Sequence, residues 1–273
     1  MALNSVNTNI SALIALQSLN KTNQQLQAVQ QRVSTGFRVA NAKDDSAAFA
    51  IAQGLRGSVQ GYESIQEQLA KAKGTTAVAN TAAKTISDTL GEIRGVMTKL
   101  ADANVTGIER TQYEGDYANL KAEVVRFIAG ANFNGTNLLN TGTGVSVISN
   151  LAGGSLTIRA SDLSTSVVAN LTAVTTPLQA QTMLASGGGL YLAETNIGTT
   201  MANLGADSKS LDSQYDYVSI LSDATTEGIG AIVDADMAKE SAKLQALQIR
   251  QQLATQTLSI ANQSPSVLLS LFK

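Results

Sequence analysis

The chain of 273 residues contains no cysteine, no histidine and no tryptophan, and only two prolines. Without cysteine it can form no disulfide and offers no thiolate nucleophile. Without histidine as well, it cannot build a Ser-His-Asp or Cys-His catalytic system or an imidazole metal site. The sequence therefore predicts a protein that is not an enzyme, with no catalytic, cofactor-binding or metal-ligating residues.

Charge and long apolar runs are also scarce. Charged residues make up 15% of the chain and the formal net charge is −2, so neither nucleic acid nor an anionic membrane is an expected partner. No run of 18 uninterrupted apolar residues occurs, which predicts no transmembrane helix. The first residues, Met1 to Val6, lack the basic and apolar regions of a cleaved signal peptide.

Both ends of the chain carry apolar residues at alternating spacings of four and three, which is typical of an amphipathic helix that packs on another helix. At about 1.5 Å per residue, each predicted helix would be roughly 45–60 Å long, which exceeds the need of a compact domain. Near the C-terminus the repeat has polar gaps at Glu240 and Gln251. The repeats comprise Ala12, Ala15, Leu19, Thr22, Leu26, Val29 and Val33, and then Val233, Met237, Leu244, Leu247, Ala254, Leu258 and Ala261.

Between the ends, a heptad pattern predicts one long helix from Ala48 to Leu100, with Ile51 among its seam positions. A shorter helix is expected over residues 113–131, followed by a turn at Phe133-Asn134-Gly135, because Asn and Gly tolerate positive φ. Alternation around Ala152-Gly153-Gly154 predicts a hairpin that pairs the region of Val145 and Val147 with that of Leu156 and Ile158. Another helix is expected over residues 197–218. Breaks are expected at Gly228 and Gly230 and, near the end of the last helix, at Pro265.

The fold class that follows is mainly α. It is a bundle of long helices with coiled-coil packing, in which the N- and C-terminal helices pair and a small β-hairpin is inserted between helical segments.

Several segments resemble those of one protein family, the bacterial flagellins, and most of all the alphaproteobacterial members. Phe37, Ser46 and Phe49 depart from the usual family residues but keep a similar volume or polarity. The segments are Leu3 to Ile10, Gln31 to Val39, Asn41 to Ala48, Phe133 to Leu139, Val233 to Asp236, Ala261 to Pro265 and Leu268 to Leu271.

The resemblance implies a structural subunit that self-polymerises into the bacterial flagellar filament for swimming. It divides the chain into an inner coiled-coil assembly domain (1–40 and 230–273), a helical core domain (41–139 and 178–229) and a short surface insert (140–177). The implied partners are other copies of the chain, possible further flagellins, the type III export apparatus and its chaperone, the filament cap and the hook-junction proteins. The implied location is the extracellular filament.

Three groups of residues are candidate sites. The apolar ends predict a subunit interface, with an ordinary intramolecular core as the alternative, at Leu3, Ile10, Leu13, Leu26, Val29, Val33, Leu244, Leu258, Val267, Leu268 and Leu271. The family motif predicts an inter-domain junction at Arg32, Gly36, Arg38, Lys43, Asp44 and Asp45. The Ser/Thr-rich insert offers either O-glycosylation sites or plain solvated loops at Thr143, Ser146 and Thr165.

Two other functions remain open from the residues alone. A hook–filament junction protein shares similar ends but does not propagate a polymer. A soluble coiled-coil scaffold would form a stable oligomer whose ends are ordered at any concentration.

Overall fold

The computed structural model describes the backbone of residues 9–270 and the side chains of residues 9–263. The chain forms two compact units, one within residues 1–57 and 224–273 and one over residues 58–223. The predicted mainly α fold with paired terminal helices and a hairpin insert is confirmed. The predicted division into three domains, with residues 140–177 as a separate insert, stays a prediction.

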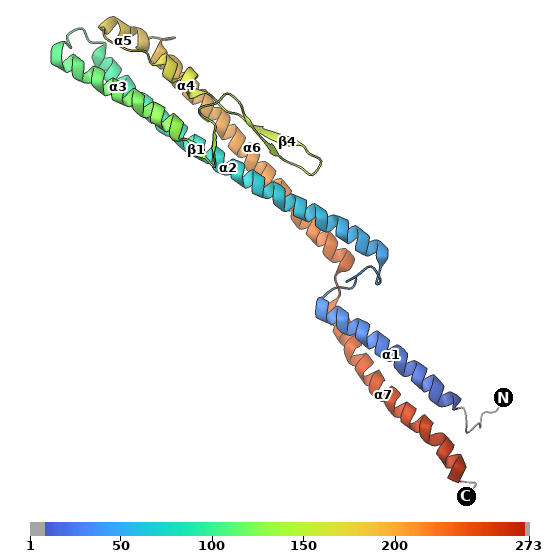
Figure 1. Ribbon diagram of the computed structural model, residues 1–273. Coiled ribbons are helices and arrows are strands. Elements are labelled where there is room, and N and C mark those ends of the chain that lie inside the picture. Colours follow the sequence, from blue (N-terminus) through green and yellow to red (C-terminus); the bar gives the residue numbers. More distant parts are fainter. Residues whose placement is uncertain (1–8, 271–273) are drawn as a thin grey trace. The chain divides into compact units, whose positions relative to one another are not determined.

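In the first unit, α1 (Ile10–Thr35) and α7 (Met237–Ser270) lie side by side (Figure 1). The Asn9 side chain caps α1 by accepting a hydrogen bond from the Ala12 amide at 3.0 Å. At its other end α1 stops at Gly36, whose φ of 76° permits the left-handed cap. The predicted pairing of the two terminal helices is thus present within one chain.

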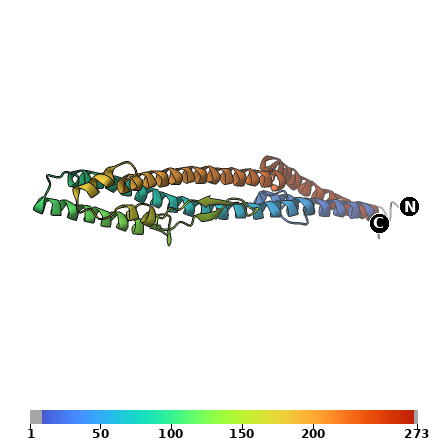
Figure 2. The ribbon, with the colours of Figure 1, turned by 90° about the horizontal axis from the view of Figure 1, so that it is seen from above.

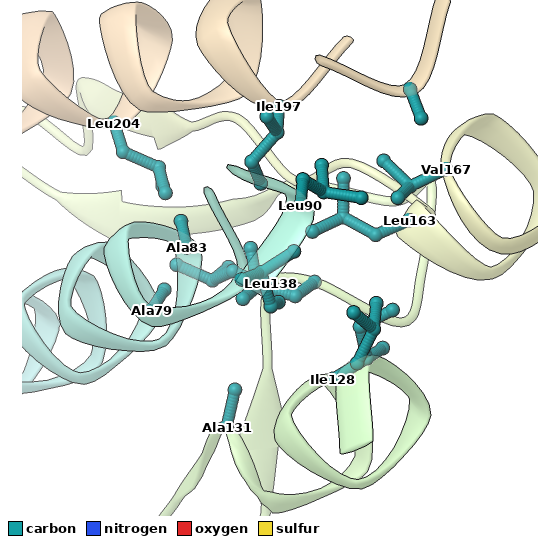
Figure 3. Packing of buried hydrophobic residues seen from close by; sticks show 14 of the residues in the cluster. Ala79, Ala83, Leu90, Ile128, Ala131, Leu138, Leu163, Val167, Ile197 and Leu204 are labelled. Carbon is teal, nitrogen blue, oxygen red and sulfur yellow. The ribbon is translucent and has the colours of Figure 1, made fainter. Parts of the chain in front are cut away.

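The second unit is built on α2 (Ser46–Leu100) and α6 (Gly189–Val233), which run beside each other in both views (Figures 1 and 2). The shorter helix α3 (Gly107–Gly130) packs on the same core. From Ile65 to Leu100, α2 buries side chains at alternating spacings of four and three residues, which confirms the heptad pattern there. In Figure 3, Leu204 of α6 lies opposite Ala83 of α2.

Two antiparallel hairpins lie in the second unit. The first joins β1 (Asn132–Phe133) to β2 (Thr136–Asn137) through Asn134 and Gly135, whose φ values of 50° and 82° confirm the predicted turn. The second joins β3 (Val145–Ile148) to β4 (Ser155–Ile158). Val145 faces Ile158 and Val147 faces Leu156 in this pairing, so the predicted hairpin is confirmed in its register.

Three local expectations are wrong. Helix α6 runs through Gly228 and Gly230 and ends at Val233, because a glycine inside a helix costs only about 1 kcal/mol relative to alanine. Helix α7 likewise continues past Pro265. Ile51 is 56% exposed rather than on the seam, since in the first turns of α2 it is Ala52 that packs, against Val39 and Val233.

Short elements that the sequence pattern did not predict follow the second hairpin. Pro177 starts α5 (Pro177–Leu184), where Thr176 and Gln179 form a capping box. Before it lie α4 (Leu163–Ser166) and the 3-10 turn η1 (Val168–Asn170). Leu163, Val167 and Leu171 from this stretch join the buried core.

An ion pair ties the second hairpin to α6. The guanidinium of Arg159 donates to the Asp207 carboxylate at 2.7 and 3.0 Å, and the Arg159 backbone amide donates to the same carboxylate at 2.8 Å. The Asp207 carboxylate raises the pKa of Arg159 further above its usual value. Asn203 accepts another guanidinium hydrogen bond at 2.8 Å, so the end of β4 is held at a fixed point on α6.

Helix α3 holds the turn after η1 through a buried phenol. The hydroxyl of Tyr117 donates to the Thr172 carbonyl at 2.7 Å, and the Lys121 ammonium donates to the Leu171 carbonyl. Tyr117 is 4% exposed, and this burial raises its pKa from 10.0 to about 12. The folded state therefore favours the neutral phenol.

We expect this phenol to make the second unit sensitive to alkali. A pKa raised by folding contributes stability that is complete below about pH 10 and is lost as the pH rises toward 12. Tyr117→Phe should lower the free energy of unfolding by about 1 kcal/mol at neutral pH, through the lost hydrogen bond. It should also flatten the decline between pH 10 and 12. Urea unfolding at several pH values measures the free energy of unfolding and its decline with pH, and Tyr191→Phe, at an exposed tyrosine, is the control. An equal decline between pH 10 and 12 for wild type and Tyr117→Phe would contradict this account.

Candidate subunit interface of the terminal helices

The paired helices bury a narrow apolar seam. Leu26, Val29 and Leu247 are each 7–8% exposed, and Val33 and Leu244 pack beside them. Leu258 is half-buried. Of the predicted interface residues, Leu26, Val29, Val33 and Leu244 therefore lie in the contact between α1 and α7 of one chain, together with Leu247.

The two polar gaps of the C-terminal repeat also lie in this contact. The side-chain amide of Gln251 donates to the Asn23 side-chain oxygen at 2.8 Å. The Glu240 carboxylate is 6% exposed; its Oε1 accepts from the Lys243 ammonium at 2.7 Å and lies 3.8 Å from an Arg32 guanidinium nitrogen. Polar partners at seam positions fix the register of paired helices, because a slip would leave each of them unpaired.

Other predicted interface residues face away from the seam. Ile10 is 53% exposed and Leu13 is 61% exposed, so the partner helix does not cover them. Leu3 and Leu271 lie outside the described residues, and of Val267 and Leu268 only the backbone is described.

The sequence analysis missed further exposed apolar side chains on both helices. Ile14 on α1 is 59% exposed, and on α7 Ile249, Leu253 and Ile260 are 57–62% exposed. The α7 set follows spacings of four and seven, so a search for a second stripe beside the main seam would have found it. An apolar surface of this kind on a two-helix unit is typical of a protein interaction site.

A groove lies on the same helix pair. Four small or apolar side chains, three cations and one amide line it. The lining residues are Gln25, Ala28, Val29, Arg32, Lys243, Ala246, Leu247 and Arg250.

Two of the predicted junction residues, Gly36 and Arg38, form backbone contacts with the segment before α7. The Gly36 carbonyl accepts from the Ala235 amide at 2.8 Å, and the Arg38 amide donates to the Val233 carbonyl at 2.7 Å. The Arg38 guanidinium donates to the Ile232 carbonyl. These contacts hold the segment after α1 against the segment before α7.

Carboxylates shape the chain between α1 and α2. Asp44 accepts from the Ala40 and Asn41 amides at 3.1 and 3.2 Å. Asp45 accepts from the Ala48 amide at 3.0 Å, as a capping residue at the start of α2. The Lys43 side chain is exposed, and no partner for it is found among the described residues.

The three candidate glycosylation residues are all exposed. Thr143 precedes β3, and Ser146 lies on the outward-facing side of that strand. The Thr165 hydroxyl donates to the Asp162 carbonyl at 3.0 Å. Modification at these positions stays a prediction.

Neither a metal centre nor a membrane span is found in the part of the chain that the structure describes. No cluster of three or more acidic side chains there is arranged to hold a metal ion. No described helix is apolar enough over sufficient length to cross a bilayer.

Gly36 offers a test of the junction geometry. Gly36→Ala should destabilise the helix pair by about 1–2 kcal/mol, because its φ of 76° is costly for any residue with a Cβ. Gly57→Ala is the matched control: Gly57 is an exposed glycine within α2, and alanine there should stabilise by about 0.4–1 kcal/mol. Thermal melting of the assembled material is followed by circular dichroism. The melting temperature should be lower than wild type for Gly36→Ala and higher than wild type for Gly57→Ala. Equal melting of both would refute the strain argument.

Comparison with known proteins agrees with the resemblance in the motifs. Residues 6–143 match the family model of the bacterial flagellin N-terminal helical region, and residues 191–272 match that of the C-terminal helical region. Flagellin FljM of Caulobacter vibrioides is 39% identical, with all of both chains covered. A flagellin of Brucella melitensis is 35% identical and covers 98% of this chain and 99% of its own.

A solved structure, the crystal structure of Bacillus cereus flagellin, is 17% identical with a TM-score of 0.37, and covers 65% of this chain and 94% of its own. The two matched helical regions together span most of the chain, and the alphaproteobacterial relatives match it from end to end. The chain therefore belongs to the bacterial flagellin family and is a structural subunit of the flagellar filament.

Proposed function

We propose that this flagellin polymerises by covering the outward apolar stripes of α1 and α7 with further copies of itself. The main support is that several large apolar side chains remain more than half exposed on this helix pair, although its seam is already filled. Burial of apolar surface yields about 25 cal/mol per Å², so several such side chains give a strong driving force for association. A contact between two different surface patches that does not close on itself generates an open helical polymer.

The seam residues and the outward residues have different roles in this proposal. Leu26, Val29 and Leu247 form the helix pair within each chain, while Ile10 and Leu13 meet neighbouring chains. Leu3, Val267, Leu268 and Leu271 are proposed for the same subunit contact on their sequence alone. Arg32, Gly36, Arg38, Lys43, Asp44 and Asp45 are proposed to join the assembly helices to the helical core.

Further partners follow from the family. We infer export through the flagellar type III apparatus with a chaperone, delivery to an extracellular filament, and contacts with the cap and the hook-junction proteins. The absence of cysteine and the low number of aromatic residues are compatible with passage as an unfolded chain. No enzymatic step is part of the proposal.

The ends of the chain should change state on assembly. Two helices with unburied outer faces are marginal in water, so residues 1–40 and 230–273 should be cut rapidly by trypsin in the monomer and protected in the polymer. Basic residues such as Lys21, Arg38 and Lys239 provide cleavage sites there. Mass spectrometry of digestion time courses measures the rate of cleavage at each site. Cleavage at Lys84 of the second unit is the internal reference. Equal protection of the ends in both states would rule out coupling of their folding to assembly.

A substitution at Leu13 tests the subunit contact without disturbing the fold of the single chain. Leu13→Ser should leave the monomer's circular dichroism unchanged, because the side chain is 61% exposed. It should raise the critical concentration for growth on filament fragments at least about tenfold, since full burial of a leucine contributes about 1.5–3 kcal/mol. Ile108→Ser is the control, because Ile108 is 80% exposed on α3. Growth equal to wild type would mean that Leu13 faces solvent in the filament.

A further inference from the structure

The turn between β1 and β2 holds the one Asn-Gly pair of the chain. No asparagine other than Asn134 is followed by glycine. Asn134 and Gly135 are both exposed, with φ values of 50° and 82°. A tight two-residue hairpin loop requires positive φ at both positions, and Asn-Gly adopts it more readily than other pairs. The first hairpin therefore depends on this dipeptide.

The same dipeptide is prone to a spontaneous reaction of asparagine. The backbone nitrogen that follows an asparagine can attack the side-chain carbonyl carbon, Cγ, and close a cyclic succinimide. When the next residue is glycine, no Cβ hinders the attack and the backbone rotates freely into the geometry that the attack needs. Asparagine is accordingly among the thermolabile residues of proteins. Because Asn134 is exposed, the water and hydroxide that the reaction requires have access to it.

One hydrogen bond in the folded turn restrains this reaction. The Gly135 amide, whose nitrogen is the attacking atom, donates to the Asn132 side-chain oxygen Oδ1 at 2.9 Å. That nitrogen must lose its proton before it can attack, so the hydrogen bond has to open first. The backbone pairing of Asn132 with Asn137 and of Phe133 with Thr136 holds the turn in this arrangement.

We propose that Asn134 is a site of spontaneous deamidation and that Asn132 slows the reaction in the folded chain. The Gly135 nitrogen, once hydroxide has removed its proton, forms a bond to Cγ of Asn134. The bond from Cγ to the side-chain nitrogen breaks, and that nitrogen leaves as ammonia. Water then opens the succinimide at either ring carbonyl. The net reaction consumes asparagine and one water and yields ammonia with aspartate or isoaspartate.

The reaction has a structural consequence for the first hairpin. Both products place a new negative charge in the turn. The isoaspartate product also routes the main chain through the former side chain, which lengthens the turn. Phe133, the preceding residue, packs closely on α2, since a Cβ added to Gly74 would lie 2.9 Å from its Cζ atom. We therefore expect the isoaspartate product to shift the Phe133 ring from its place against Gly74.

Mass spectrometry of aged protein tests the site itself. Trypsin releases residues 127–159 as one peptide, which contains Asn134 and also Asn140, an exposed asparagine followed by threonine. Deamidation replaces an amino group by a hydroxyl group and raises the mass of the fragment that carries it. After incubation in mildly alkaline buffer, and relative to an unaged sample, Asn134 should be modified well before Asn140. Equal modification of the two would overturn the assignment of the site.

Three variants test the protecting role of Asn132. Asn132→Ala removes the acceptor and should speed deamidation of Asn134 about fivefold, which corresponds to the loss of one hydrogen bond. Asn132→Asp keeps an acceptor oxygen and should remain close to wild type. Asn150→Ala is the matched control, because Asn150 accepts from the Gly154 amide at 2.8 Å in the second hairpin. It should leave the rate at Asn134 unchanged.

Unfolding in urea separates the effect of the fold from that of the local sequence. In urea the turn is absent, so wild type and Asn132→Ala should react at the same rate, faster than folded wild type. A rate difference that persists in urea, or folded Asn132→Ala that reacts like wild type, would overturn the protecting role. The reaction takes place within one chain, so none of these outcomes depends on whether the protein polymerises.

Discussion

Two paired helices can cover only one face of each other, and this geometric limit governs the terminal part of the chain. The seam between α1 and α7 is filled by Leu26, Val29 and Leu247, so it has no room for further apolar residues. Ile10, Leu13 and the outward residues of α7 consequently remain in contact with water. A surface with this composition is stable when other copies cover it, which is the property that a filament subunit requires.

In the second unit the central helix is covered on more than one face, because more than two elements surround it. Helix α2 meets α6, α3 and residues of the second hairpin in one buried cluster, so its heptad seam is covered from several directions (Figure 3). Polar contacts fix the surrounding elements at defined points, as with Arg159 on Asp207 and Tyr117 on the Thr172 carbonyl. The unit therefore has a complete core without another copy.

Local sequence signals predicted the structure well where the cause was local. Asn134 and Gly135 adopt positive φ because they are the residues that tolerate it, and the hairpin register follows from alternation on both strands. Predictions failed where packing overruled a propensity. Gly228 and Gly230 stay helical within α6, and Ile51 turns to solvent because Ala52 fits against Val39 and Val233. The polar gaps at Glu240 and Gln251 were visible in the sequence, but their partners Arg32 and Asn23 lie on a helix more than 200 residues away.

By itself, the sequence determined the helical class, the pairing of the two ends and the family, because periodicity and motifs are properties of short segments. Only the tertiary structure decided which apolar residues are used within one chain and which remain exposed. That distinction depends on the rotation of each helix about its own axis, and this rotation is set by contacts between segments far apart in the sequence. Likewise, the groove that Lys243 and Arg250 line became visible only once α1 and α7 were packed together.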